Sequence, residues 1–254
     1  MKQKRLENIT SFLTIQDAFI DIGTDHAYIP IHMAKKGCQN ILATDIHPKA
    51  LEIAKKNIAK EHLENQIKTV VADGLKKIDT QNYDTLVIAG MGASTIIKIL
   101  SLTQKLTTIK KIIIESNNDL EDVRRFMNKI HYGLVSEKVL KEKKHYYVIM
   151  KFVPMKQKLK DIEYEFGLFQ EENKDYYLSL QKHYKNLYQK IPENRPLLKE
   201  KINEKIQKLD AYWKKTGFEE ERNFSSFFIL LIGCLETWMG STFLEEGPIN
   251  SFAS

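Results

Sequence analysis

The sequence predicts an α/β protein with a doubly wound, mostly parallel sheet, and three observations support this fold class. Short apolar segments alternate with helical patterns between residues 19 and 130, and such alternation favours a parallel sheet with right-handed crossovers. Each apolar segment ends in an acid, a glycine or an amide, and open α/β sheets bind ligands at the carboxyl ends of their strands. Two long amphipathic stretches follow residue 154, which predicts a separate helical part.

The first strand, residues 19–22, runs into a tight turn that opens a helix. A glycine in this turn lets a ligand approach the backbone, and a helix start offers free N–H groups. The alternative is an ordinary strand-to-helix turn with two solvated acids. Because later strands repeat the pattern, we predict that the turn binds part of a cofactor. The predicted cofactor residues here are Asp21, Gly23, Thr24, Asp25 and His26.

The second and third strands, residues 40–46 and 69–74, also end in acids. In nucleotide-binding folds an acid about 20 residues beyond the first turn typically binds ribose hydroxyls, and Asp45 occupies that place. Its neighbour Ile46 is included in the predicted site. A ribose-bearing cofactor is therefore the leading hypothesis.

The remaining strands complete the sheet. Residues 84–92 end in a glycine pair around Met91, and residues 111–117 end in polar groups. Residues 133–140 and 145–152 are separated by a charged stretch and are predicted to form a closing antiparallel pair. Helical patterns occupy residues 49–59, 93–100 and 120–130. A parallel sheet finished by such a hairpin is the architecture of class I methyltransferases, which have a Rossmann-like fold and use S-adenosylmethionine.

Beyond Pro154 two apolar stripes at helical spacing indicate an antiparallel helical hairpin, or coiled coil. A Pro-containing segment, residues 192–196, separates them. The first stripe is Ile162, Phe166, Phe169, Tyr176, Leu180, Leu187 and Ile191, and the second is Leu198, Ile202, Ile206, Leu209 and Trp213. Aromatic stripes at this spacing are usually core. The alternative is an exposed face on which Tyr177, Tyr184 and Tyr188 contact RNA.

These patterns divide the chain into a catalytic domain at 1–153, a helical appendage at 154–222 and an apolar tail of unassigned role at 223–254. The apolar run in the tail is shorter than the roughly 18–20 residues that a membrane span needs. The N-terminus lacks the apolar core of a signal peptide. The two cysteines and scattered histidines lack metal-ligand spacing. We therefore expect a cytoplasmic protein without a metal or a membrane anchor.

Positive charge is concentrated in the first part. Residues 1–153 hold 24 Lys and Arg against 17 Asp and Glu, a balance of +7, and residues 154–254 hold 15 against 16, a balance of −1. Such an excess attracts phosphate-rich partners, although a lysine-rich surface without a partner is the alternative. Arg124 and Arg125, after the fifth strand, are the predicted RNA contacts. On a helix they point about 100° apart, so we expect only one of them to face a nucleic acid.

Four motifs, at residues 21–30, 72–74, 88–92 and 123–125, together resemble the bacterial tRNA (adenine-22-N1)-methyltransferase family, TrmK. The resemblance covers about residues 4–153, and the helical part is similar to the coiled-coil appendage of that family. The family usually has Gln-Pro-Asn where this chain has Glu115-Ser116-Asn117, so only Asn117 carries over. The resemblance implies S-adenosylmethionine-dependent methylation of tRNA at N1 of adenine 22.

With this function as the hypothesis, the strand ends receive predicted roles. The acid of the second strand should accept hydrogen bonds from both ribose hydroxyls, and Asp73 should receive the adenine amino group beside Gly74. The turn at 21–26 should surround the methionine end, with a purely structural His26 as the alternative. The acceptor adenine is expected at Gly90, Met91 and Asn117. No obligatory protein partner is expected, and a monomer fits the sequence.

The expected chemistry makes modest demands on the protein. Adenine N1 carries an in-plane lone pair and needs no strong base, so the main work is alignment. Watson–Crick pairing would occupy N1, so the target must be unpaired or extruded. The fourth strand lacks the Asn/Asp-Pro-Pro-aromatic signature of exocyclic-amine methyltransferases, which argues against N6 chemistry. A small-molecule methyltransferase and a catalytically silent RNA-binding protein on the same fold remain the alternatives.

Overall fold

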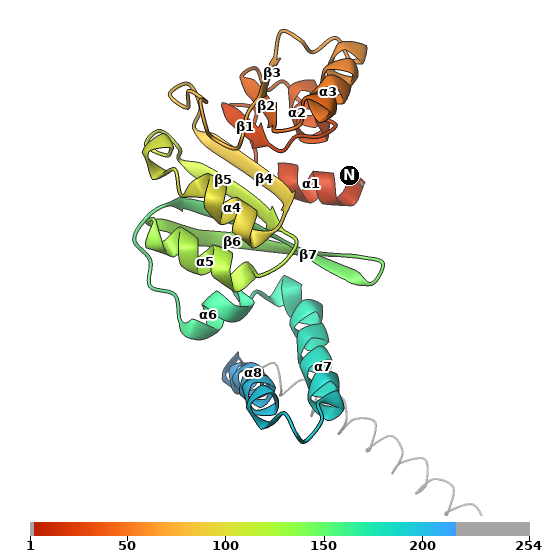
Figure 1. Ribbon diagram of the computed structural model, residues 1–254, viewed down its shortest axis with the longest axis vertical. Helices are drawn as coiled ribbons and strands as arrows, with labels where there is room; N and C mark the ends of the chain where they lie inside the picture. Colours follow the sequence, from red (N-terminus) through yellow and green to blue (C-terminus); the bar gives the residue numbers. More distant parts are fainter. Residues whose placement is uncertain (1–2, 217–254) are drawn as a thin grey trace, which may run out of the picture. The chain divides into compact units, whose positions relative to one another are not determined.

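The computed structural model describes residues 3–216, and the predicted apolar tail at 223–254 lies outside them (Figure 1). The chain divides into two compact units, Met1–Tyr176 and Tyr177–Ser254. The first unit contains a sheet and the helices that cover it. Within residues 3–216, none of the helices combines the length and apolarity that crossing a membrane requires.

Seven strands of the described residues form one sheet in the order β3-β2-β1-β4-β5-β7-β6. They are β1 (Phe19–Ile22), β2 (Ile41–Asp45), β3 (Ile67–Val71), β4 (Thr85–Met91), β5 (Lys111–Ser116), β6 (Tyr132–Glu142) and β7 (His145–Pro154). Strands β1 to β5 pair in parallel, whereas β7 pairs antiparallel with both β5 and β6. This topology confirms the predicted class I, Rossmann-like sheet with its closing hairpin.

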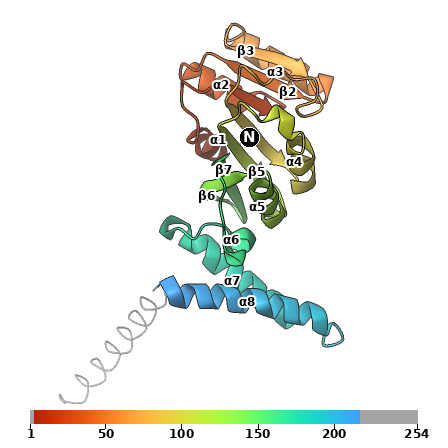
Figure 2. The ribbon, with the colours of Figure 1, turned by 90° about the vertical axis from the view of Figure 1, so that its left-hand side faces the viewer.

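Helices cover both faces of the sheet (Figure 2). On one face lie α4 (Ala93–Leu100) and α5 (Leu120–Lys129), and on the other lie α1 (Gln3–Thr10), α2 (Tyr28–Lys35) and α3 (Pro48–Lys60). Along β5, Ile112 and Ile114 belong to the first apolar layer and Ile113 to the second. Burial on both faces explains the run of β-branched residues in this strand. Helix α1 was not predicted from the sequence.

The strand order reverses at β1 and β4, which opens a crevice at the carboxyl ends of the strands. The turn after β1 is fixed to β2, because the N–H groups of Gly23 and Thr24 donate to the carbonyl oxygen of Thr44 at 2.8 and 2.9 Å. The register between β4 and β5 shifts next to Gly90. This irregularity leaves Gly90 outside the regular pairing, at the mouth of the crevice.

The prediction of one continuous helix along the first apolar stripe is wrong. Helix α6 (Asp161–Phe166) ends at Gly167, whose φ is 96°, and packs against α5 in the first unit. A short 3-10 turn at Glu171–Asn173 precedes α7 (Lys174–Lys190). The positive φ of Gly167 ends the helix. The chain therefore forms two separate helices, although the apolar spacing in the sequence continues across the break.

The second unit contains α7 from Tyr177 onward and the whole of α8 (Pro196–Thr216). An apolar cluster joins the two helices through Ile191, Ile202 and Ile206. Tyr184 and Tyr188 pack against this cluster. The contacts confirm the predicted helical hairpin, and they favour a core role for these two tyrosines over a base-stacking face.

Candidate functional site

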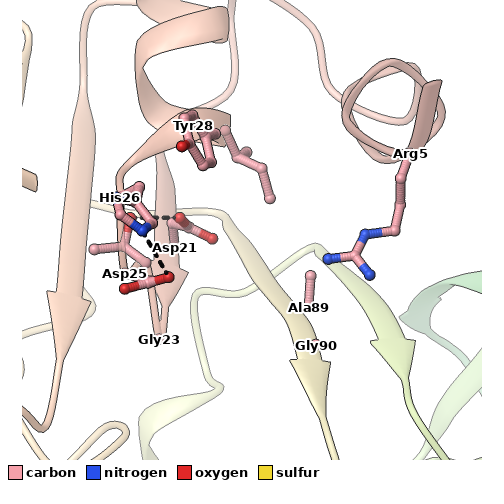
Figure 3. A pocket seen from close by; sticks show the side chains of 10 residues that line it. Arg5, Asp21, Gly23, Asp25, His26, Tyr28, Ala89 and Gly90 are labelled. Atoms are coloured by element: carbon pink, nitrogen blue, oxygen red, sulfur yellow. Dashed lines mark hydrogen bonds and ion pairs between the residues drawn. The ribbon is translucent and has the colours of Figure 1, made fainter. Parts of the chain in front are cut away.

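Two adjoining cavities open at the carboxyl ends of the parallel strands. The turn cavity, of about 220 Å³, lies between the β1–α2 turn, Arg5 of α1 and the end of β4 (Figure 3). The strand-end cavity, of about 430 Å³, lies over the ends of β1 to β4 and beside α4. Gly23, Ala89 and Gly90 line both cavities. The two cavities therefore meet along these backbones.

The structure brings most of the predicted site residues to these cavities. The turn cavity is lined by Asp21, Gly23, Thr24, Asp25 and His26. The strand-end cavity is lined by Gly23, Asp45, Ile46, Asp73 and Gly74, together with Gly90 and Met91 of the predicted acceptor site. Residues that are far apart in the sequence thus share one edge of the sheet.

Asp45 is held by the backbone around it. Its Oδ2 accepts a hydrogen bond from the N–H of Asp25 at 3.2 Å, and its Oδ1 accepts one from the N–H of His47 at 2.8 Å. The side chain is 7% exposed and lines the strand-end cavity. Each carboxylate oxygen keeps a second lone pair, so Asp45 can accept two further hydrogen bonds from a ligand.

Asp21 is a buried acid at the base of the turn cavity. Its Oδ2 accepts a hydrogen bond from the hydroxyl of Thr24 at 2.7 Å. Burial raises the pKa of Asp21 to about 7, the hydrogen bond from Thr24 opposes this rise, and the charge of Asp45 adds to it. Asp21 therefore changes its protonation state near neutral pH. A cationic group in the cavity would lower its pKa.

The β1–α2 turn has an unusual backbone. Gly23 has a φ of 78°, and a Cβ at this position would lie 2.1 Å from the Cε of Met91. Asp25 and Ala27 also have positive φ values, of 50° and 59°. Such conformations cost energy and cluster at functional sites.

Two aromatic rings border the turn cavity. The ring of His26 stacks on that of Tyr28, with centroids 5.2 Å apart and planes at 26°. The Nε2 of His26 also lies 3.5 Å from the Oδ2 of Asp25. Tyr28 is 42% exposed and was not among the predicted site residues, although it belongs to the motif at 21–30.

The end of β3 combines an acid with a close backbone approach. Asp73 forms an ion pair with Lys76 at 2.5 Å, and the hydrogen bond from that lysine lowers the pKa of the carboxyl. Gly74 has a φ of 60°, and a Cβ there would lie 2.8 Å from the Cγ1 of Ile99. Glycine at this position thus lets the side chain of Ile99 on α4 pack against the backbone beside Asp73.

Asn117 stands beside the cavities rather than as part of their described lining. Its Nδ2 donates to the carbonyl oxygen of Gly90 at 2.8 Å, and its N–H donates to that of Met91 at 2.9 Å. Its neighbour Asn118, which the sequence analysis did not single out, accepts a hydrogen bond from the N–H of Ala93 at 3.0 Å. These contacts fix the ends of β4 and β5 and the start of α4.

The prediction that Arg124 contacts RNA is contradicted by its burial. Its side chain is 1% exposed and forms an ion pair with Glu137 at 2.8 Å. Its NH1 group also donates to the carbonyl oxygen of Tyr164 at 3.0 Å. The helix face that carries Arg124 packs into the protein, so its charge is paired with the buried carboxylate of Glu137.

Arg125 lies on the exposed side of α5. It pairs with Glu121 at 2.8 Å and lies 3.5 Å from Asp161. Its guanidinium also sits 4.6 Å from the centre of the Tyr164 ring. Arg125 stays a predicted RNA contact, with part of its charge already balanced by these neighbours.

Two polar residues near the site were given no role in the sequence analysis. Arg5 of α1 lines the turn cavity, and its Nε is buried without a hydrogen-bond partner among the described residues. Glu115 of β5 is 1% exposed, and neither of its carboxylate oxygens makes a full hydrogen bond within the described part of the chain. Only tertiary structure brings Arg5 to the strand ends, whereas Glu115 lies near the end of β5 in the sequence itself. In residues 3–216 there is no group of three His, Cys, Asp or Glu side chains arranged to hold a metal ion.

Comparison with known proteins shows to which family this chain is related. The family model described as a methyltransferase domain matches residues 2–150. The tRNA (adenine(22)-N(1))-methyltransferase of Bacillus subtilis is 30% identical over 141 residues, which are 55% of this chain and 59% of that protein. The chain spans about three fifths of the length of the first two curated relatives that it matches.

Two solved structures extend the likeness into the helical part. TrmK of Mycoplasma capricolum, solved with S-adenosyl-homocysteine, is 30% identical with a TM-score of 0.73, over 84% of this chain and 97% of that one. A Streptococcus pneumoniae protein, solved with S-adenosyl-L-methionine, is 26% identical with a TM-score of 0.75, over 83% and 99%. The chain belongs to the methyltransferase domain family and, within it, to the TrmK family.

Proposed function

We propose that this chain is an S-adenosylmethionine-dependent methyltransferase that methylates N1 of adenine 22 in tRNA. The observation that carries the proposal is the pair of cavities that meet at Gly90, in a chain related to TrmK of Mycoplasma capricolum solved with S-adenosyl-homocysteine. One cavity suits a nucleoside and the other a small charged group. The protein acts on tRNA in the cytoplasm and needs no metal.

The lining of the cavities fits the proposed cofactor. Asp45 has the free lone pairs to accept both ribose hydroxyls, and Ile46 offers an apolar surface that is 52% exposed. Asp73 can accept from the amino group of adenine, beside Gly74. The buried carboxyl of Asp21 suits an ammonium group. S-adenosylmethionine supplies an electrophilic methyl group bound to a sulfonium.

The protein's own work is to align the acceptor and to stabilise charge. Gly90 lines both cavities, and Asn117 holds its carbonyl oxygen at 2.8 Å from Nδ2. We assign Gly90, Met91 and Asn117 to the acceptor side because they end the strands next to this junction. A reacting pair must be held about 3–3.5 Å apart. Methylation leaves the adenine cationic, and backbone carbonyls or carboxylates aimed at it stabilise that charge.

Two features outside the cavities are proposed to contact tRNA. Residues 1–153 carry 24 basic against 17 acidic side chains, and such an excess attracts a polyanion with salt-sensitive affinity. Exposed Arg125 is one proposed contact. The helical hairpin is the other proposed contact. The likeness to the TrmK structure of Mycoplasma capricolum covers 84% of this chain and so extends into the hairpin. Residues 1–153 are proposed as the catalytic domain and 154–222 as the appendage that helps to hold tRNA.

Methyl transfer to unmodified bulk tRNA, followed by nucleoside mass spectrometry and with cofactor binding measured by calorimetry, tests the proposal. We expect S-adenosylmethionine to bind and 1-methyladenosine to appear. Binding without any tRNA product would favour a small-molecule methyltransferase. Absence of cofactor binding by the folded chain would favour a silent RNA-binding protein.

A further inference from the structure

Arg5 brings a positive charge to the turn cavity from outside the sheet. It stands on α1, whose Ile9 is buried in the apolar layer of that face. Its side chain lines the cavity on the side opposite Asp21, with Ala89 and Gly90 between them (Figure 3). The Nε group is buried and makes no hydrogen bond to the described residues. A buried donor without a partner is costly, which points to a ligand as its partner.

Tyr147 of the sheet contacts Arg5, and a buried carboxyl lies within electrostatic reach of it. Its guanidinium carbon lies 5.0 Å from the centre of the Tyr147 ring, a distance at which a cation and an aromatic face attract each other. Glu115 shares the strand face of Ile113, which belongs to the same layer as α1. Burial raises the pKa of Glu115, whereas the charge of Arg5 and the N–H of Gly90 lower it. Arg5 thus lies within electrostatic reach of a buried carboxyl.

The charges around the turn cavity are complementary to a zwitterion. Arg5 is on one side, and Asp21 and Asp25 are on the other. An anion alone would be repelled by the two acids, and a cation alone by the guanidinium. An α-amino-acid group carries an ammonium and a carboxylate group on the same carbon atom, so it can face the acids on one side of the cavity and Arg5 on the other. A guanidinium binds a carboxylate through two parallel hydrogen bonds, which a lysine cannot reproduce.

We propose that Arg5 binds the carboxylate of the amino-acid end of the methyl donor, opposite Asp21. The inference rests on the proposed function and assigns that site a specificity residue. It predicts that the protein distinguishes a complete donor from a nucleoside that lacks the amino-acid group.

Calorimetry with two ligands tests the role of Arg5. S-adenosylhomocysteine carries the amino-acid end, and 5′-deoxy-5′-methylthioadenosine lacks it. Arg5→Gln should weaken binding of the first by about tenfold or more, the loss expected for one charge-assisted interaction, and leave binding of the second unchanged. Arg5→Lys should fall between the wild type and Arg5→Gln. Lys4→Gln, which changes an exposed charge on the same helix, should match the wild type for both ligands.

The outcomes separate the inference from the proposed function. Equal loss of both ligands in Arg5→Gln would mean that Arg5 only shapes the fold, and no loss of either would remove it from the site; both results overturn the inference. If the wild type binds neither ligand, the proposed function fails with it.

Discussion

Arg124 of α5 and Glu137 of β6 form a buried ion pair, and the segment after α6 is hydrogen-bonded to it. The pair is 2.8 Å long, and each side chain is 1% exposed. Glu137 also accepts a hydrogen bond from the N–H of Leu168. A Cβ at Gly167 would lie 2.8 Å from the NH2 group of Arg124, so the segment can pass over the pair only with glycine there. The pair, called the clamp below, thus joins α5, β6 and the segment after α6 within the first unit.

The clamp predicts a stability defect rather than an RNA-binding defect for Arg124→Met. Removing one partner of a buried ion pair leaves an uncompensated charge and costs about 3–5 kcal/mol. Urea denaturation should show this loss. The matched variant Arg125→Met removes an exposed pair and should cost at most about 1 kcal/mol. Unchanged stability of Arg124→Met with weaker tRNA binding would restore the original assignment.

Asp45→Ala should weaken S-adenosylhomocysteine binding by roughly a hundredfold or more, because two charge-assisted hydrogen bonds are lost and each contributes about 1.5–3 kcal/mol. Stability should also fall modestly, since the N–H groups of Asp25 and His47 lose their acceptor. Calorimetry on the folded variant measures the affinity. Glu52→Gln, an exposed acid on α3, is the control. Wild-type affinity in Asp45→Ala would remove Asp45 from the site.

Asp21 predicts a pH dependence of stability. Burial raises its pKa from 3.8 to about 7. Between these values the unfolded chain loses the proton that the folded chain keeps, so the free energy of unfolding falls as the pH rises through this window. Asp21→Asn removes this dependence and keeps an acceptor for Thr24. Denaturation at about pH 5 and about pH 8 should show a smaller drop for the variant than for the wild type. An equal drop in both proteins would contradict the perturbed state of Asp21.

Truncation after Tyr176 should separate cofactor binding from tRNA methylation. The first unit ends there, and the described linings of both cavities lie in α1 to α4 and the strands between them. Cofactor affinity should therefore be unchanged, whereas tRNA methylation should fall sharply. Full methylation by the truncated, folded protein would show that the hairpin does not hold tRNA. An earlier cut, after Phe152, would remove the end of β7 and α6 and confuse stability with function.

The parts of the site that the sequence predicted are those encoded locally. Asp21, Asp45 and Asp73 each follow an apolar run, and parallel strands bring such ends together by topology alone. Arg5 was missed because its place depends on how α1 packs on the sheet. Arg124 was misassigned because two adjacent helix positions cannot be told apart as inner or outer without a neighbour to pack against. The pattern of apolar residues that continues past Gly167 hid the break that its backbone imposes.

The central claim is tested most directly with two tRNA transcripts that differ only at position 22, one with adenine and one with guanine. The wild-type protein and S-adenosylmethionine should produce 1-methyladenosine in the first transcript and none in the second, as read by mass spectrometry of nuclease fragments. Equal methylation of both transcripts, or a methyl group on another atom or nucleotide, would contradict the assignment of this chain as an adenine-22 N1-methyltransferase.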